Sequence, residues 1–229
     1  MNTWDTASVP KESVTTVHLL RHGKVQNPSD ILYGLLPGYH LAQSGRAMAQ
    51  GVADYLCGPP ASGGPVDIAY LAASRLDRAQ ETAAPLAAAT GLPIVTDDRL
   101  IEAANSFEGT RFTASTLKSP ANLARLRNPA LPSWGEPYLQ IARRMLGAVY
   151  AAEQVARGRV AVLVSHQLPI WTLRRFLEGK RLWHNPAGRQ CALASLTTLI
   201  FAGGVLDSIH YSEPVAHIAG VNDPAGTPA

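Results

Sequence analysis

Arginine and histidine side chains that could bind and transfer a phosphoryl group occur after two apolar runs of the chain. Arg21-His22-Gly23 directly follows the first run, and His166 closely follows a later one. An arginine presents a planar fork of N–H donors that fits phosphate oxygens. A neighbouring histidine can serve as a nucleophile, a general base or a proton donor. These residue types indicate phosphoryl chemistry if the fold brings them together.

Further polar side chains follow the same apolar runs or neighbouring ones. Ser74 and Arg78 come after a second run, and Glu102 follows a short third one. Gln167 comes directly after His166. Taken alone, the first tripeptide also fits an ordinary loop. Its weight comes from the other groups, because two arginines, two histidines and a glutamate at neighbouring strand ends would form a phosphate pocket with a nucleophile and an acid.

The apolar runs predict the strands that must position these groups. The aliphatic run at residues 160–164 suits a central parallel strand that is buried on both faces. In open α/β sheets, ligands bind at the carboxyl ends of the strands. The expected strands are Val17–Leu20, Asp67–Ala73, Ile94–Thr96 and Arg159–Ser165, followed by a hairpin of Leu193–Phe201 and Val205–Tyr211.

Helical patterns alternate with these strands. The expected helices are Gly45–Cys57 with Ser44 as N-cap, a segment that opens at Ser74 and runs to Thr90, Glu136–Arg157, and Pro169–Leu177. Alternating strands and helices favour an α/β fold. We therefore expect a three-layer sandwich with a mainly parallel central sheet and helices on both faces.

Length and composition predict a single domain over residues 1–229, because 46% of the residues are hydrophobic and can bury a sizeable core. Residues 1–15 are polar and are expected to be a loose arm, and residues 214–229 a mobile tail. Residues 97–135 contain Pro120, Pro129 and Pro132 and read as an excursion from the sheet, an insertion or lid. The long loop of residues 24–40 reads as functional.

Charge and cysteine content exclude several classes of function. The net charge is +3 without a long basic run, which suits a small anionic substrate and does not indicate nucleic-acid binding. Cys57 and Cys191 lie in no CxxC pair, so no zinc site is predicted and a reduced cytoplasmic protein is expected. The apolar stretch Leu193–Leu206 is too broken to span a membrane, and the start of the chain carries no leader pattern. A homodimer is compatible with the sequence.

The ordered set of motifs resembles the histidine phosphatase superfamily, in its phosphoglycerate-mutase-like branch. That family has Arg-His-Gly after the first strand, then Ser-x-x-x-Arg-Ala-x-x-Thr-Ala, then Leu-x-Glu, and a second histidine after a late strand. The matching segments here are Arg21 to Gly23, Ser74 to Ala83, Leu100 to Glu102, and His166. Each motif is weak alone, but the set follows the family's order over residues 17–170.

The resemblance implies a role for each matching residue. His22 is the expected nucleophile, which attacks a phosphate monoester and becomes a phosphohistidine. Arg21, Arg78 and His166 are expected to hold the phosphoryl oxygens and to stabilise the transition state by their charge. Glu102 is expected to protonate the leaving alcohol and then to activate water, with a raised pKa that suits this work. No metal and no cofactor is expected.

Several departures from the family pattern concern additional phosphate contacts. Lys24 replaces the glutamate that commonly follows Arg-His-Gly. Pro28 stands where an asparagine often contacts the phosphate, and Asn27, one residue earlier, is the candidate for that contact. Gln167 replaces the glycine that follows the second histidine in mutases and is a further candidate for phosphate binding.

Some charged residues have simpler interpretations. Arg75 is expected to pair with Asp77 or Glu81 on a helix surface, and Glu108 is a weaker rival of the acid Glu102. His18 is expected to be a core or edge residue. Asp97-Asp98 reads as a solvated turn, because no further ligands follow at metal-binding spacing.

Two other functions stay open beside hydrolysis of a small phosphorylated metabolite. A cofactor-dependent phosphoglycerate mutase needs cationic groups for the substrate carboxylate, yet residues 97–135 contain no adjacent arginine pair; Arg111 and Lys118 could substitute. A catalytically weak phosphate-binding member of the family is the other alternative. A cysteine phosphatase is excluded, because Gly63 and Thr197 stand where Cys-x5-Arg requires arginine.

Overall fold

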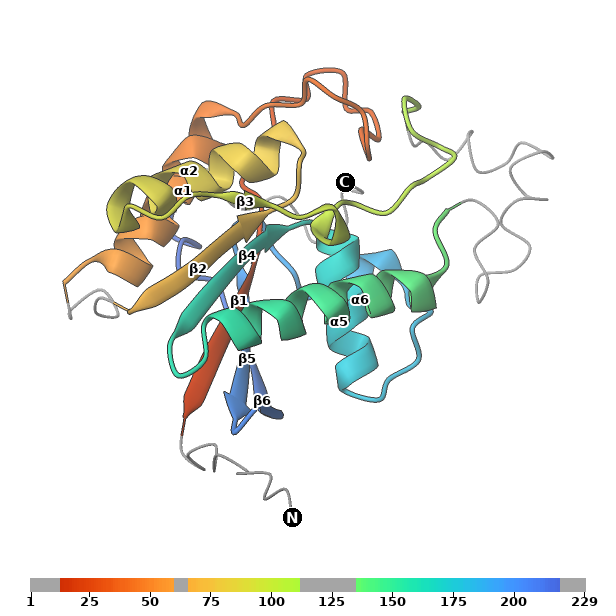
Figure 1. Ribbon diagram of the computed structural model, residues 1–229. Coiled ribbons are helices and arrows are strands. Elements are labelled where there is room, and N and C mark those ends of the chain that lie inside the picture. The colour runs from red at the N-terminus through yellow and green to blue at the C-terminus, as the bar shows by residue number, and fades with distance from the viewer. Residues whose placement is uncertain (1–12, 60–65, 112–134, 219–229) are drawn as a thin grey trace, which may run out of the picture.

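A six-stranded sheet forms the centre of the molecule in the computed structural model, which describes residues 13–59, 66–111 and 135–218 (Figure 1). The strands are β1 (Val14–Arg21), β2 (Ile68–Ala73), β3 (Val95–Thr96), β4 (Val160–Ser165), β5 (Leu196–Ala202) and β6 (Val205–Ser212). Their order in the sheet is β3-β2-β4-β1-β5-β6. The first four are parallel to one another, whereas β5 is antiparallel to both β1 and β6. The predicted mainly parallel sheet is confirmed.

Helices cover both faces of this sheet (Figure 1). The helices are α1 (Gln43–Cys57), α2 (Asp77–Thr90), α5 (Tyr138–Val155) and α6 (Gln167–Leu177), with short 3-10 turns η2 (Asp98–Leu100) and η3 (Pro186–Gly188). Alternate residues of β4 serve the two layers. Ala161 and Leu163 pack with α5 and α6, and Val162 and Val164 pack with α1 and α2. The three-layer sandwich is therefore confirmed. In the described part of the chain, no helix has the length and apolarity needed to cross a membrane.

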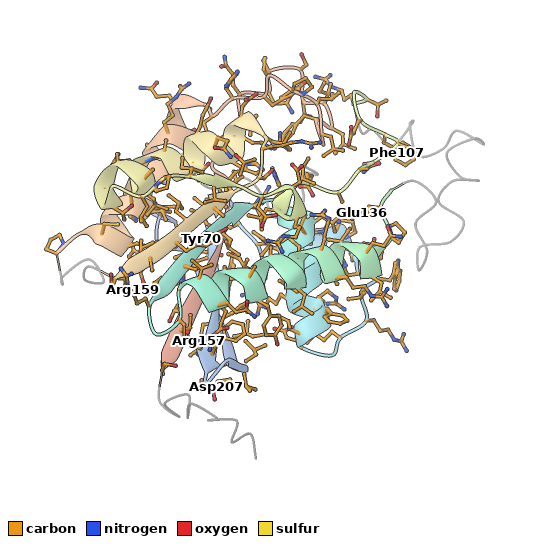
Figure 2. The ribbon with its side chains drawn as sticks, in the orientation of Figure 1. Tyr70, Phe107, Glu136, Arg157, Arg159 and Asp207 are labelled. Atoms are coloured by element: carbon orange, nitrogen blue, oxygen red, sulfur yellow. The ribbon has the colours of Figure 1, made fainter. Side chains whose placement is uncertain are left out.

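The register of the parallel strands brings their carboxyl ends to one edge of the sheet. Arg21 of β1 lies opposite Ser165 of β4, and Ala73 of β2 lies opposite Val164. Arg159 lies at the opposite end of the sheet (Figure 2), where it forms an exposed ion pair with Asp67. The residues after β1, β2 and β4 thus meet at the end where the sequence predicts the phosphate pocket.

All four helices start two or three residues from the predicted positions: α2 begins at Asp77 and not at Ser74, and α5 at Tyr138 and not at Glu136. The other two starts have a clear local cause. Helix α1 begins at Gln43 with Ala42 as N-cap, so Ser44 lies inside the first turn and is not the N-cap. The Ala42 N–H donates to Lys24 O at 2.8 Å, so a loop contact fixes this end where no capping side chain does. Helix α6 begins at Gln167 and not at Pro169, because a proline is tolerated in the first turn, where its missing N–H has no helical partner.

The predicted arm and tail both extend too far into the ordered core. Val14 and Thr15 belong to β1, and Thr15 is fully buried, with its Oγ1 accepting from Gly158 N–H at 3.0 Å. Val215 is buried in the α1–α2 layer. The expectation of a loose arm to residue 15 and a mobile tail from residue 214 is therefore wrong for these residues. Residues 1–12 and 219–229 lie outside the described residues.

The first residues of the segment predicted as a lid pack against the rest of the protein. Asp97 N–H donates to Ala73 O at 3.0 Å, and Leu100, Ala103 and Phe107 are buried. The excursion is thus wrong for residues 97–103, because Leu100 and Ala103 pack against the sheet and α5. Residues 112–134, with the three prolines and Lys118, lie outside the described residues.

Candidate active site

The side chain of His22 is completely buried immediately after the end of β1. Its Nδ1 lies 2.8 Å from Gly23 O. A carbonyl oxygen only accepts, so Nδ1 carries the ring hydrogen and Nε2 keeps a free lone pair. Nε2 is buried and has no hydrogen-bond partner among the described residues. The geometry leaves a nucleophilic nitrogen available at the carboxyl edge of the sheet.

Burial and two arginines keep the His22 imidazole neutral. Burial lowers its pKa well below the ordinary value of 6.5, and the charges of Arg78 and Arg21 lower it further. The hydrogen bond to Gly23 O opposes this shift and does not reverse it. A neutral imidazole is the form that can attack phosphorus.

Gly23 is required for close packing and not for backbone freedom. Its backbone φ is not positive. A Cβ on Gly23 would lie 2.6 Å from Gly45 O in the first turn of α1, so the missing side chain admits the helix and not a ligand. The Gly23 N–H donates to Thr82 Oγ1 at 3.1 Å, and that hydroxyl donates to Arg78 O at 2.6 Å. These contacts hold the loop after His22 against both α1 and α2.

Gly45→Ala should destabilise the fold, although alanine favours a helix by about 1 kcal/mol over glycine. A Cβ at Gly45 would overlap the backbone oxygen of Lys24, which cannot move without shifting the nucleophile loop. We expect a loss of at least about 2 kcal/mol in unfolding free energy, measured by urea titration. Gly188→Ala is the control, because nothing lies within 4 Å of its added Cβ. A Gly45→Ala protein as stable as the parent would contradict the packing role.

His166 occupies the N-cap of α6, directly after β4, and is also completely buried. Its ring centre lies 5.1 Å from that of His22. Its Nε2 lies 2.9 Å from Ser74 Oγ, while Nδ1 is buried without a partner among the described residues. Burial, followed by the charge of Arg78, lowers its pKa well below 6.5. A hydroxyl that donates to Nε2 puts the ring hydrogen on Nδ1, where it could be given to a phosphoryl oxygen.

Arg21 and Arg78 place positive charge at the same edge without a carboxylate partner in the described part of the chain. Arg21 Nη1 donates to Cys191 O at 2.8 Å, and Arg78 Nη2 donates to Gly34 O at 2.6 Å. The Arg78 guanidinium also lies 4.8 Å from the centre of the Tyr33 ring. Both Nε atoms are buried and lack partners among these residues. Two such cations with spare donors suit a phosphate group.

Glu102 lies just after η2 and is almost fully buried. Its Oε1 accepts from Ala103 N–H at 2.9 Å, and Oε2 is buried with no partner among the residues described. Burial raises the pKa of Glu102 above 4.5, against the opposing charges of Arg78 and Arg189. Burial thus shifts the carboxyl group toward its protonated, proton-donating form.

Glu108, the rival acid, has a different setting. It is only partly buried, and its Oε1 accepts from Asn105 N–H at 3.1 Å in its own turn. Asn27 is similarly engaged, because its amide bonds Ile31 N–H and Ile31 O. The phosphate contact of Asn27 stays a prediction.

The structure shows which partners Arg75 and Asp97 have. Arg75 pairs at 3.2 Å with Asp98, and not with Asp77 or Glu81, since it precedes α2 and points to the neighbouring turn. Asp97 pairs with Arg99 at 2.7 Å. Across the described ranges, no group of three or more His, Cys, Asp or Glu is placed to hold a metal ion.

Gln167 connects the phosphate-binding side to a residue that the sequence did not single out. Its Nε2 donates at 3.4 Å to Cys191 O, the acceptor of Arg21. Its Oε1 accepts from Arg189 Nη1 at 3.3 Å. Arg189 follows η3 in a segment with no motif, so only tertiary packing reveals it.

Comparisons with known proteins agree with this geometry. The family model "Histidine phosphatase superfamily (branch 1)" matches residues 17–213. Uncharacterized protein Rv0525 of Mycobacterium tuberculosis is 51% identical over 210 residues, which are 91% of this chain and 100% of that protein. The range matched by the family model includes all of the predicted site residues.

Solved structures show the same architecture. YhfR of Bacillus stearothermophilus is 26% identical with a TM-score of 0.69, over 84% of this chain and 94% of that one. Mycobacterial glucosyl-3-phosphoglycerate phosphatase Rv2419c is 27% identical with a TM-score of 0.65, over 87% and 96%. A phosphoglycerate mutase of Bacillus anthracis, 19% identical with a TM-score of 0.68 over 93% and 99%, shares the fold.

Proposed function

The chain belongs to branch 1 of the histidine phosphatase superfamily, and from this premise we propose that it hydrolyses phosphomonoesters through a phosphohistidine on His22. The observation that carries the proposal is the buried, unpartnered Nε2 of a neutral His22 beside Arg21 and Arg78. A nitrogen with a free lone pair next to uncompensated guanidinium groups is what phosphoryl transfer to a side chain requires.

In the first step, the lone pair of His22 Nε2 forms a bond to phosphorus while the ester P–O bond breaks. Arg21 and Arg78 stabilise the negative charge on the equatorial oxygens, and the Nδ1 hydrogen of His166 contributes a further donor. Glu102 gives its proton to the leaving alcohol oxygen. The hydrogen bond from His22 Nδ1 to Gly23 O supports the positive charge that develops on the imidazole.

In the second step, water attacks the phosphorus of the phosphohistidine. Glu102, now a carboxylate, takes a proton from that water, and the P–N bond breaks with its electron pair returning to Nε2. Inorganic phosphate leaves, and both His22 and Glu102 regain their starting protonation states. Since the two arginines supply the positive charge and His166 supplies a further hydrogen-bond donor, no metal ion is assigned a task.

Two observations favour hydrolysis over a mutase reaction. Rv2419c, a phosphatase by name, resembles this chain at 27% identity, whereas the mutase resemblance at 19% shows only the fold. Arg111, one candidate for gripping a substrate carboxylate, donates to Ser29 O at 3.2 Å on the surface.

Cys57 and Cys191 are free thiols, which fits the cytoplasm as the compartment that we propose.

Release of phosphate from a panel of small phosphomonoesters tests the proposal. The panel includes 3-phosphoglycerate, with and without 2,3-bisphosphoglycerate, and each assay is repeated in EDTA. We expect free phosphate from the panel at a rate that EDTA leaves unchanged. Rapid formation of 2-phosphoglycerate with little free phosphate would establish the mutase instead, and binding without turnover would establish the phosphate-binding alternative.

A further inference from the structure

Arg189 is a partly buried arginine that the proposed mechanism does not use. Its Nε donates to His184 Nε2 at 2.9 Å, and its Nη1 donates to Gln167 Oε1 at 3.3 Å. Both acceptors are neutral. Within the described ranges, Arg189 has no salt bridge, and its Nη2 has no hydrogen-bond partner. The site therefore holds a shielded positive charge that forms no salt bridge with the described residues and whose main charge partner is the buried Glu102, an arrangement that favours an incoming anion while Glu102 is protonated.

His184 fixes the orientation of this guanidinium. His184 Nδ1 donates to Leu182 O at 2.7 Å, so Nε2 must carry the lone pair that accepts from Arg189. Burial lowers the pKa of His184 to about 4, and the ring stays neutral around neutral pH. The rings of Tyr138 and Trp171 flank His184, with centres at 5.8 and 6.1 Å. The Arg189 guanidinium is thus held in one orientation by His184, which is itself packed against two aromatic rings.

Arg189 is connected to the phosphoryl site through a single side chain. The amide of Gln167 bonds Arg189 on one side and shares Cys191 O with Arg21 on the other. Burial raises the pKa of Glu102, and the charge of Arg189 opposes this rise. Arg189 therefore lies near both Gln167 and the group that protonates the leaving oxygen in the proposed mechanism.

We propose that Arg189 binds a second anionic group of the substrate, a carboxylate or a second phosphate on the alcohol that leaves. The inference rests on the proposed function, because that function defines the leaving group. In the proposed mechanism, Arg21 and Arg78 serve the transferred phosphoryl group, and Glu102 acts as the protonated, uncharged acid. The positive charge of Arg189 is therefore available to bind the second anionic group of the substrate. The substrates are small metabolites that carry a phosphomonoester and a second oxyanion.

Matched substrate pairs test this assignment. The carboxylate pair is 3-phosphoglycerate and glycerol 3-phosphate, and the phosphate pair is fructose 1,6-bisphosphate and fructose 6-phosphate. For at least one pair, we expect kcat/KM to favour the more anionic member by roughly 10- to 100-fold, the scale of a hydrogen bond to a charged group. The pair that shows the preference identifies the oxyanion. Equal values in both pairs would overturn the proposal.

Arg189→Gln should reduce that preference to near unity, mainly through KM of the more anionic substrate. A purely structural role would instead lower kcat/KM for both members equally. Arg189→Lys retains the charge and should keep part of the preference. Arg181→Gln is the matched control, because Arg181 is an exposed arginine in the same segment between α6 and η3. The Arg181→Gln protein should show the same substrate preference as the parent.

Binding to the His22→Ala protein separates this inference from the proposed function. Calorimetry with 3-phosphoglycerate and glycerol 3-phosphate, and with the two fructose esters, needs no turnover. If the parent hydrolyses nothing, the proposed function fails, yet a binding preference that Arg189→Gln removes would still support the anion site. If the parent hydrolyses phosphomonoesters but neither binding nor kcat/KM depends on Arg189, the anion site alone is wrong.

Discussion

Replacing His22 with alanine is expected to lower phosphomonoester turnover by roughly 10⁴-fold or more, the scale on which loss of a covalent nucleophile is felt. The buried Nε2 of His22 has no hydrogen-bond partner among the described residues, and the charges of Arg78 and Arg21 act on this ring. Steady-state release of phosphate measures the loss. Labelled substrate should leave an adduct on the parent protein that acid removes and base does not.

The matched control is His210→Ala, since His210 is exposed on β6 and contacts Ser208. It should turn over substrate like the parent and form the same adduct. Because the alanine variant also loses a buried ring, its unfolding midpoint is measured beside its activity. A folded His22→Ala protein with normal turnover would rule out the phosphohistidine mechanism.

Replacing Glu102 with glutamine is expected to lower kcat/KM for alkyl phosphates by about 10²- to 10⁴-fold. The ratio kcat/KM reports the first step, in which the Glu102 proton reaches the leaving oxygen. For p-nitrophenyl phosphate the loss should be much smaller, since its leaving group departs without a proton. The second step also lacks its base, so phosphohistidine should accumulate in this variant with the activated substrate. Equal losses on both substrates would indicate a binding role.

The pH profile of alkyl phosphate hydrolysis gives a second measure of Glu102. Burial raises its pKa above 4.5, and the protonated form is the active one, so kcat/KM should fall as pH rises through that pKa. The acidic limb should lie below pH 6.5, because burial lowers the pKa of His22. Glu102→Gln should abolish the alkaline limb. Glu108→Gln is the control, and a profile altered only by this change would move the acid role to Glu108.

Most of the fold followed from patterns that act locally. The aliphatic run in β4 predicted a central buried strand, and Ala161 to Val164 are indeed fully buried between two layers. Residues after parallel strands must share an edge, which is why His22 and His166, far apart in sequence, lie with ring centres 5.1 Å apart. Periodicity and strand polarity were sufficient for these features.

What the sequence did not show depends on contacts between distant segments. Ser44 has the chemistry of an N-cap, but the contact between Ala42 and Lys24 sets the start of α1. Arg189 has no motif, and its place beside Gln167 depends on how the segment after α6 folds back. Leu100 is buried in the core, so the first residues of the predicted lid belong to the body of the protein. The prolines of the same segment had suggested an excursion from the sheet.

The position of β1 in the sheet also determines when the protein can assemble. This strand opens the described chain, yet its neighbours β4 and β5 begin at residues 160 and 196. During synthesis, β1 therefore has both edges unpaired until most of the chain has left the ribosome. Contacts between such distant segments slow folding, because a long loop must close before any pairing is gained. The nucleophile is therefore synthesised well before the residues of β4 and α6 that complete its pocket.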